Sequence, residues 1–417
     1  MTKTPRPRTT GGHIRRPLPT GWRRVRLGEV CEINPRRPLL NRSDSAPTSF
    51  IPMESVDAQS GVVSDTRTRP YIEVKKGYTY FAEDDVLFAK ITPCMQNGKH
   101  AIARGLIDGI GFGTTEFHVL RPKDLIIPEM IWYFLRQPSV LIDATEHFTG
   151  AVGQQRLPEN YVSNLDIPLP PLAEQRRIAA VLKEQMAAVE KARAAAQARL
   201  EAVKALPAAF LRQVFPQPDQ PLPSGWRWVK LGEVIEIASG QVDPKEPCYR
   251  DLPHVNGENI ESGTGRLMAI RSAAEDQMTS GKYLFEAGVV LYSKLRPYLK
   301  KAAIADFRGL CSADMYPILP KPDELTLPFL LQILLSESFT TYAESESQRA
   351  RMPKLNRDQL LAYSAPVPPL SEQRRIAGAL REKMAAVEKA RAAAEAELET
   401  INALPAALLR RAFSGEL

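Results

Sequence analysis

Cysteine and histidine are scarce in this chain, which has 417 residues but only four cysteines and five histidines. Cys31, Cys94, Cys248 and Cys311 are widely scattered and form neither a CxxC pair nor a ligand spacing with histidine. This usage argues against a zinc site or a disulfide framework and predicts free thiols in a reducing cytoplasm. No metal ion and no cofactor are expected.

Long apolar runs are also missing, since no stretch approaches the roughly 20 residues that a membrane span requires. The first 17 residues are rich in Arg, Pro, Gly and Thr and lack the apolar centre of a secretory signal. They are predicted to form a flexible basic tail. The sequence therefore predicts a cytoplasmic protein that does not contact a membrane.

Catalytic signatures are not found either, because the chain has no Walker loop and no catalytic triad. GIGFG at 109–113 is not accompanied by a second methyltransferase motif and is predicted to form a hairpin turn. Glu73 and Lys75, with Asp65 upstream, have the residue types of a Mg²⁺-dependent nuclease. The second half of the chain lacks this pattern, and an alternating strand explains YIEVKK better. The residues thus identify no catalytic site, and a stand-alone DNA nuclease that uses Glu73 and Lys75 is kept as an alternative.

The charge balance is mildly basic. The 55 Lys and Arg residues against 48 Asp and Glu residues give a net charge of +7. This balance suits a polyanion such as nucleic acid, but it is too small to decide the partner. A hydrophobic content of 44% is ordinary for a folded protein, and the length favours two or three domains.

The chain contains a long internal repeat. PLAEQRRIAAVLKEQMAAVEKARAAAQARLEAVKALPAAFLRQVF at 171–215 returns as PLSEQRRIAGALREKMAAVEKARAAAEAELETINALPAALLRRAF at 369–413, with an offset of 198 positions. LPTGWRRVRLGEVCEI, beginning at Leu18, likewise returns as LPSGWRWVKLGEVIEI, beginning at Leu222. A duplication of this length predicts two similar halves.

Each repeated segment is predicted to form a long helix, because its apolar residues recur at intervals of three and four. Pro171 and Pro369 suit a first helical turn, whereas Pro207 and Pro405 are expected to stop or kink the helix. At about 1.5 Å per residue, each helix would be roughly 50 Å long. The predicted seam comprises Ile178, Leu182, Val189, Ala192, Ala196, Val203 and Leu206, followed by Ile376, Leu380, Val387, Ala390, Ala394, Ile401 and Leu404.

This apolar stripe has two interpretations: the helices pair with each other, or each helix covers its own globular domain. Their length, their alanine-rich middle and the presence of two matching copies favour the pair. Gln185, Arg199, Lys383 and Glu397 fall on the same stripe, where they weaken the seam or set its register. Neither the register nor the direction of the helices follows from the sequence.

The segments before the helices are predicted to be mixed α and β domains. Short β-like runs between Gly and Pro are followed by the helical patterns PEMIWYFLRQPSV and LPFLLQILLSESFTTYAE. The expected fold is α+β. Its predicted order is a tail at 1–17, a domain at 18–170, a helix at 171–215, a second domain at 216–368, and a helix with a tail at 369–417.

Basic and amide side chains cluster at matching places in the two domains. Lys and Arg neutralise phosphates, while Gln, Asn and Arg can form paired hydrogen bonds to base edges. A solvated surface loop is the alternative for each residue. The candidate DNA-binding residues are Lys90, Thr92, Gln96, Asn97, Lys99, Gln154, Gln155 and Arg156 in the first domain, and Lys294, Arg296, Tyr298, Lys300, Lys301, Arg349 and Arg351 in the second.

Several of these segments resemble the specificity subunit of type I restriction-modification systems. They are GWRRVRLGEV and GWRWVKLGEV, LFAKITPCMQNGK and LYSKLRPYLK, and above all PPLAEQRRIAAVL and PPLSEQRRIAGAL. The resemblance extends from about Leu18 to Phe413. It implies a non-catalytic subunit that binds double-stranded DNA through two target recognition domains. Residues 50–164 would read one half of a bipartite target and residues 241–363 the other.

The resemblance further implies that the two helices form an antiparallel coiled coil with pseudo-twofold symmetry, which acts as a spacer. The implied protein partners are two methyltransferase subunits and restriction motor-nuclease subunits. Base-contacting residues are not assigned by the resemblance. A coiled-coil scaffold without DNA specificity is the remaining alternative.

Overall fold

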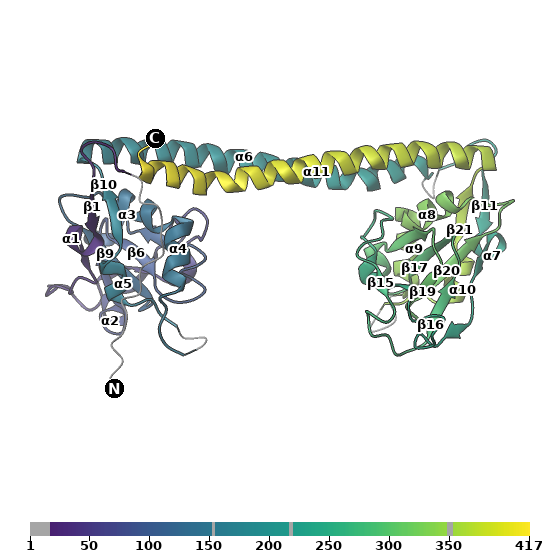
Figure 1. Cartoon of the computed structure of the whole chain (residues 1–417), viewed down its shortest axis with the longest axis horizontal. Coiled ribbons are helices and arrows are strands. Elements are labelled where there is room, and N and C mark those ends of the chain that lie inside the picture. Colours follow the sequence, from purple (N-terminus) through teal and green to yellow (C-terminus); the bar gives the residue numbers. More distant parts are fainter. Residues whose placement is uncertain (1–16, 152–154, 217–219, 348–352) are drawn as a thin grey trace, which may run out of the picture. The chain divides into compact units, whose positions relative to one another are not determined.

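The computed structural model describes residues 17–417 except 152–154, 217–219 and 348–352. Its contacts divide the chain into two compact units, Met1–Ala194 with Leu398–Leu417, and Ala195–Glu397. Each unit therefore combines one mixed domain, the first part of the helix that follows it, and the last part of the other long helix (Figure 1). The predicted α+β class, with two similar domains each followed by a long helix, is confirmed.

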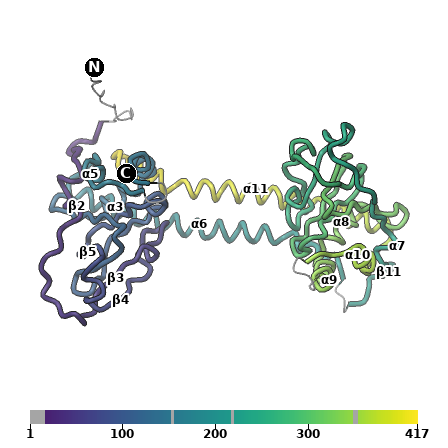
Figure 2. The backbone as a smooth tube through the Cα atoms, turned by 90° about the horizontal axis from the view of Figure 1, so that it is seen from below, coloured from purple at the N-terminus to yellow at the C-terminus, as the bar shows by residue number. Residues whose placement is uncertain are grey.

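In the first unit, described strands pair in the orders β2-β9-β6-β7, β4-β3-β8-β5 and β1-β10. Strands β3 and β8 run parallel, and the other pairs are antiparallel. Figure 2 shows β3, β4 and β5 lying together. The strands are β1 (Arg23–Arg26), β2 (Cys31–Ile33), β3 (Pro47–Ile51), β4 (Arg67–Pro70), β5 (Thr79–Ala82), β6 (Val86–Ala89), β7 (His100–Ile102), β8 (Ile110–Gly113), β9 (Phe117–Pro122) and β10 (Asp166–Leu169).

The main core of the first unit lies between the sheet β2-β9-β6-β7 and helix α3, which packs on β6 and β7. Helix α3 begins at Pro128, where the missing amide costs no hydrogen bond. Leu409 and Phe413, from the last turns of the chain, complete this core. The helices are α1 (Leu27–Val30), α2 (Tyr71–Val74), α3 (Pro128–Leu135), α4 (Pro138–Thr145), α5 (Glu159–Ser163) and α6 (Leu172–Val214).

The second unit repeats this plan, with described strands in the orders β12-β20-β17-β18, β13-β16-β19-β14-β15 and β11-β21. Helix α8 packs on β17 and β18, and Leu211 and Phe215 from the end of α6 complete the core. The elements are β11 (Arg227–Lys230), α7 (Leu231–Val234), β12 (Ile235–Ile237), β13 (Gln241–Val242), β14 (Pro253–Val255), β15 (Arg271–Ser272), β16 (Lys282–Phe285), β17 (Val289–Ser293), β18 (Ala302–Ala305), β19 (Gly309–Cys311), β20 (Met315–Pro320), α8 (Leu327–Leu335), α9 (Glu337–Ser347), α10 (Arg357–Ala362), β21 (Ser364–Val367) and α11 (Leu370–Ser414).

Both long helices continue through the prolines, so the expected stop does not occur. Pro207 lies inside α6 and Pro405 inside α11. An internal proline costs about 3 kcal/mol because a backbone hydrogen bond is lost. Burial of Leu211 and Phe215 after Pro207 offsets this cost, since burying each such side chain contributes about 1.5–3 kcal/mol.

Two smaller expectations from the sequence are also wrong. Residues 71–74 form the short helix α2 instead of a strand, and the buried Tyr71 and Val74 follow the three-residue spacing of a helix. GIGFG is mostly strand β8. Gly113 serves close packing there, because a Cβ at this position would lie 2.5 Å from the carbonyl oxygen of Ile51.

Contacts within each unit show that the two long helices run antiparallel. In the first unit, Arg177 donates to the carbonyl oxygen of Leu417 and Arg193 donates to the side-chain oxygen of Asn402, at 2.5 and 2.8 Å. In the second unit, Arg199 contacts Glu397 at 2.6 Å, and the Lys383 ammonium lies 4.8 Å from the centre of the Phe210 ring. In both units the residue number rises along one helix as it falls along the other. The implied antiparallel pairing is confirmed.

The buried stripe on these helices departs from the predicted seam by one position. Ala192, Leu206, Ala390 and Leu404 are exposed and lie outside the stripe, which corrects their assignment. Four residues after Val189 the helix turns Arg193 inward instead, and the buried Leu200 continues the stripe. The predicted residues Ile178, Leu182, Val189, Ala196, Ile376, Leu380, Val387 and Ala394 are buried, while Val203 and Ile401 are half-buried.

Arg199 and Glu397 are equivalent positions of the repeat, offset by 198, and they form an ion pair with each other. Replacing Arg199 with glutamate would bring two carboxylates together. We expect this change to lower the free energy of unfolding by about 0.5–1 kcal/mol at low salt, the range of exposed pairs. Chemical denaturation measures the change. The double variant R199E/E397R should recover the loss, and an R199E protein as stable as wild type at low salt would contradict a stabilising pair.

Candidate DNA interface

In the first domain, Lys90 and Arg156 lie beside the carboxylate of Glu116. Lys90 follows β6, and Arg156 pairs with Ile91 through an isolated β-bridge. The Arg156 guanidinium donates to both oxygens of Glu116 at 2.7 and 2.8 Å, and this bond lowers the pKa of Glu116. Partial burial lowers the pKa of Lys90. Two cations around one carboxylate leave a local excess of positive charge, which suits a phosphate.

The second domain holds the same arrangement in other residues. Lys294 follows β17, and its Nζ lies 3.9 Å from a carboxylate oxygen of Asp314, which is 3.6 Å from the Nζ of Lys354. The Lys294 ammonium also donates to the carbonyl oxygen of Ala313 and lies 5.1 Å from the centre of the Tyr316 ring. Burial, together with the nearby Lys354, lowers the pKa of Lys294. Only 7% of Lys294 is exposed, so its role is largely structural.

Lys354, not the predicted Arg349 or Arg351, occupies the place of Arg156 in the second domain, since Arg156 bridges to Ile91 and Lys354 to Leu295. In the structure, the amide of Leu157 donates to the carbonyl oxygen of Lys90, and that of Leu355 donates to the carbonyl oxygen of Lys294. Leu355 follows Leu157 by the repeat offset of 198, which would have identified Lys354. Gln154, Arg349 and Arg351 lie outside the described residues.

Two further candidates hold the fold together. The ammonium of Lys99 donates to the carbonyl oxygens of Met53 and Val56 at 3.0 and 3.1 Å. Lys301 likewise donates to the carbonyl oxygen of Gly257. Both lysines thus tie a loop to the 3₁₀ turn at the equivalent place in their domain.

The exposed candidates are Gln96, Asn97 and Arg156 in the first domain and Arg296 and Tyr298 in the second. Arg296 and Lys300 have φ angles of 50° and 47°. This left-handed region is unfavourable for residues with side chains, so the surrounding structure holds the turn between them in place. Its rigidity suits a turn that presents Arg296 and Tyr298 to a partner. Thr92, Gln155 and Lys300 are half-buried.

A cavity of about 450 Å³ opens beside Lys90 in the first domain. Arg37, Lys75, Tyr78 and Tyr80 line it with further cationic and aromatic groups that the sequence interpretation missed. Lys75 forms an ion pair with Asp44 at 2.6 Å. The cations of this lining suit the phosphates of a DNA backbone. Loop and strand residues from distant parts of the sequence build this lining, so no local pattern revealed it.

The alternative of a Mg²⁺-dependent nuclease finds little support at Glu73 and Lys75. Glu73 lies on the short helix α2, and the ammonium of Lys75 is already paired with Asp44. Among the described residues, no three His, Cys, Asp or Glu side chains are placed to hold a metal ion.

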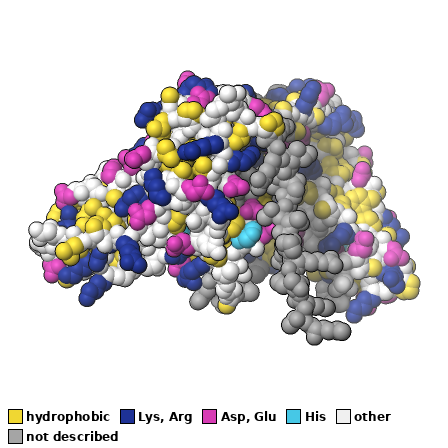
Figure 3. Space-filling model, turned by 60° about the vertical axis from the view of Figure 1, so that its left-hand side comes forward, with side chains coloured by type: hydrophobic (Ala, Val, Ile, Leu, Met, Phe, Trp, Pro, Cys, Tyr) yellow, Lys and Arg dark blue, Asp and Glu magenta, His cyan; other side chains and the backbone are white. Residues whose placement is uncertain are grey.

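On the face shown in Figure 3, Lys and Arg are interspersed with Asp and Glu. Within the same described part of the chain, no helix has the length and apolar character to cross a membrane.

Alanine variants separate DNA contacts from structural contacts. Replacing the exposed Arg296 is expected to weaken DNA binding about tenfold, with thermal stability unchanged, since a good arginine contact to a base contributes about 1–3 kcal/mol. Replacing Lys301 should instead lower stability, because the carbonyl oxygen of Gly257 loses its partner. Fluorescence anisotropy with duplex DNA and thermal melting measure the two effects. An R296A protein that binds DNA as tightly as wild type would remove Arg296 from the candidates.

Comparisons with known proteins bear on both domains. The family model described as Type I restriction modification DNA specificity domain matches residues 19–197 and again residues 223–398. The type I restriction enzyme EcoDI specificity subunit of Escherichia coli is 37% identical over 196 residues, covering 47% of this chain and 43% of that protein. The EcoAI specificity subunit of the same organism is 41% identical over 162 residues, covering 39% and 27%. The chain thus matches less than half the length of these relatives.

Two solved structures cover almost the whole chain. One, described as "Structural basis underlying complex assembly and conformational transition of the type I R-M system", has a TM-score of 0.79 and 26% identity, covering 96% of this chain and 100% of its own. The HsdS subunit from Thermoanaerobacter tengcongensis has a TM-score of 0.63 and 28% identity, covering 97% and 99%. Both support the fold of two domains with two long helices.

Proposed function

Because the chain belongs to the type I restriction-modification DNA specificity family, we propose that it binds a bipartite DNA target and directs the modification and restriction subunits to it. The first domain reads one half of the target and the second domain reads the other. The observation that carries this proposal is that the family match occurs twice, over two domains of the same fold whose exposed loops differ. Domains with different loops suit different half-sites.

The helices carry the second part of the proposal. EQRRIA, MAAVEKARAAA and ALPAA are identical in the two copies, in contrast to the loops of the domains. Identical surfaces in both halves suit two copies of the same partner, and two methyltransferase subunits are the proposed occupants. Restriction motor-nuclease subunits join this complex. The chain itself performs no chemical step, and the paired helices set the distance between the two half-sites.

DNA binding to the purified chain, alone and with its methyltransferase, tests the proposal. Affinity should fall steeply as salt rises, because phosphate contacts release counterions, and it should increase with the methyltransferase present. A scaffold without DNA specificity would bind weakly, with no preference among sequences. Incubation with DNA and Mg²⁺ should leave the DNA uncut in the absence of the other subunits, whereas cleavage by the chain alone would indicate a nuclease.

Exchanging one domain tests whether each domain reads one half of the target. Replacing residues 241–363 with the corresponding segment of another family member should change one half of the modified sequence and leave the other half intact. Mapping modified bases across the host genome reads out both halves at once. An unaltered map would contradict a reading role for the exchanged domain.

A further inference from the structure

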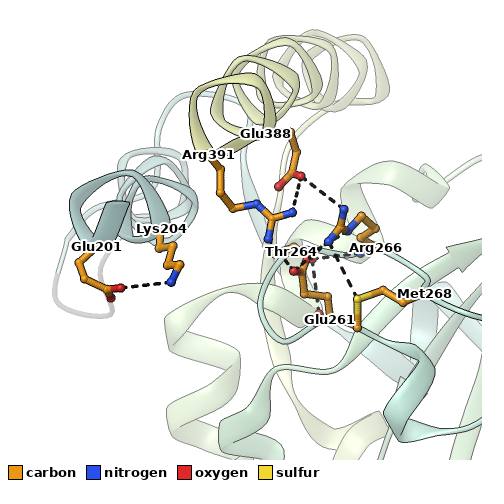
Figure 4. Close-up of polar contacts among 8 residues, drawn as sticks. All are labelled: Glu201, Lys204, Glu261, Thr264, Arg266, Met268, Glu388 and Arg391. Carbon is orange, nitrogen blue, oxygen red and sulfur yellow. Dashed lines mark hydrogen bonds and ion pairs between the residues drawn. The ribbon is translucent and has the colours of Figure 1, made fainter. Parts of the chain in front are cut away.

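A network of four charged side chains joins the second domain to the helix that follows it. Arg391 on α11 donates to the carboxylates of Glu261 and Glu388 at 2.9 and 2.8 Å. Arg266 donates to both oxygens of Glu261 at 3.0 Å and lies 3.5 Å from Glu388. Figure 4 shows Glu261 and Arg266 on the domain, facing Glu388 and Arg391 on the helix. Two cations and two carboxylates thus bridge the domain and α11.

The geometry of this network differs from that of an ordinary surface ion pair. The side chains of Arg391 and Glu261 are only 19% and 20% exposed. Arg266 makes a two-pronged contact with Glu261, and the Thr264 hydroxyl donates to the same carboxylate at 3.0 Å. Paired, partly buried hydrogen bonds between charged groups hold a defined geometry better than single exposed pairs do. The loop at 261–266 is therefore held in one place against α11.

This loop also contacts the turn that presents the candidate DNA-binding residues of the second domain. The amide of Gly263 donates to the carbonyl oxygen of Lys300 at 3.0 Å. Lys300 closes the turn that carries Arg296 and Tyr298. A short chain of contacts thus runs from Arg391 on the helix to the turn.

The equivalent arginine in the first half keeps the glutamate three residues before it as a partner but has a different second partner. Arg193, 198 positions before Arg391, donates to the Glu190 carboxylate at 2.6 Å and to the side-chain oxygen of Asn402 on the other helix at 2.8 Å. The repeat equivalent of Asn402 is Lys204, a cation paired with Glu201 at 3.1 Å (Figure 4). Because two cations repel, Arg391 cannot make the corresponding contact and turns toward the domain.

The domain side of the contact differs as well. The isolated bridges Val56–Val63 and Ile260–Leu267 show that Asp57 is the equivalent of Glu261. Asp57 accepts hydrogen bonds from the amide and hydroxyl of Ser60, both at 2.7 Å, within its own loop. In the first half, the counterparts of Glu261 and Arg391 thus have other partners. Asp57 bonds Ser60 within its own loop, and Arg193 bonds Asn402 on the other helix.

We infer that Arg391 is a positioning residue: through Glu261 it fixes the second target recognition domain, with its Arg296–Tyr298 turn, on α11 and so restricts the gap between half-sites that the complex accepts. This inference rests on the proposed function. It makes the two domains unequal, because Arg391 ties the second domain to its helix, whereas the equivalent Arg193 bonds Asn402 on the other helix. The link depends on salt, since ion pairs that retain some exposure are screened.

Hydrogen exchange on the full chain tests the link without DNA. In an Arg391→Ala variant, amides of residues 261–268 should exchange about tenfold faster, because local opening becomes easier. Arg193→Ala is the matched control and should leave that loop as in wild type. Arg391→Lys keeps the charge and should restore part of the protection. Unchanged exchange in Arg391→Ala overturns the inference.

Binding to DNA with altered gaps tests the positioning role. The probes are duplexes carrying the mapped target with its natural gap, or with the gap changed by one base pair, bound to the chain with its methyltransferase. Wild type should prefer the natural gap, and Arg391→Ala should reduce this preference about fivefold, a change of about 1 kcal/mol, while Arg193→Ala retains it. A loosened loop with undiminished gap preference overturns the positioning role. A wild-type complex without any gap preference contradicts the spacer of the proposed function, and the exchange experiment still decides whether the link exists.

Discussion

Replacing Phe413 with alanine is expected to destabilise the first unit by about 3–5 kcal/mol, although this residue belongs to the second half of the chain. Phe413 is 7% exposed and lies in the core of the first unit. Its ring meets that of Phe134 edge-on, with 5.6 Å between centroids. The loss combines the transfer of a large apolar side chain with the cavity left behind. Hydrogen exchange resolved by peptide measures the stability of each unit separately.

Phe215 provides the matched control for this experiment, because it is the repeat equivalent of Phe413 and packs against Phe329 in the second unit at 5.6 Å. Phe215→Ala should therefore weaken the second unit and leave the first largely intact. The two variants together test whether each unit is completed by the helix end of the other half. Equal loosening of both units in either variant would contradict that organisation.

Lengthening both long helices is expected to widen the gap between the two half-sites without changing their sequences. Seven residues inserted beside Arg199 in α6 and beside Glu397 in α11 keep the apolar stripe nearly in phase. At about 1.5 Å per residue they add about 10 Å, equal to roughly three base pairs of duplex. Mapping modified bases in the host shows the new gap directly. The effect is large because a complex whose half-site readers have the wrong spacing would no longer modify the original sites.

An insertion of the same length in the exposed turn at Gly240 is the control for this experiment. It leaves both helices unchanged and should preserve the natural gap. A helix-lengthened protein that continues to modify sites with the original gap would show that the helices do not set the spacing. The ion pair of Arg199 with Glu397 provides a local check, because the matched insertion can be designed to retain it.

Part of the candidate interface was predictable because charge and repeat position are visible in the sequence. Lys90, Arg156 and the exposed Arg296 were identified in this way. The sequence could not show that the ammonium groups of Lys99 and Lys301 are bound to carbonyl oxygens. A lysine on the surface and a lysine that holds a loop have the same local pattern. The lining by Arg37 and Tyr78 was missed because it depends on loops that meet only in the folded domain.

The prediction for the helices was also limited, because their buried face and their ends depend on tertiary packing. Periodicity identified both helices, but it placed Ala192 on the seam where the structure turns Arg193 inward. Intervals of three and four are both compatible with a period of 3.6 residues, so only the partner surface selects between them. Pro207 likewise appeared to be a stop signal. Burial of Phe215 beyond it outweighs the local preference.

The sequence by itself determined that the chain is duplicated, that each half is an α+β domain followed by a long helix, and which family these halves resemble. These properties are encoded locally, in letters repeated at a constant offset and in the period of the apolar residues. Only the tertiary structure decided that each unit is completed by the helix end of the other half. It also decided that Arg391 contacts the domain while Arg193 contacts the other helix. These contacts form between charged and apolar groups that are far apart in the sequence, so no local sequence pattern predicts them.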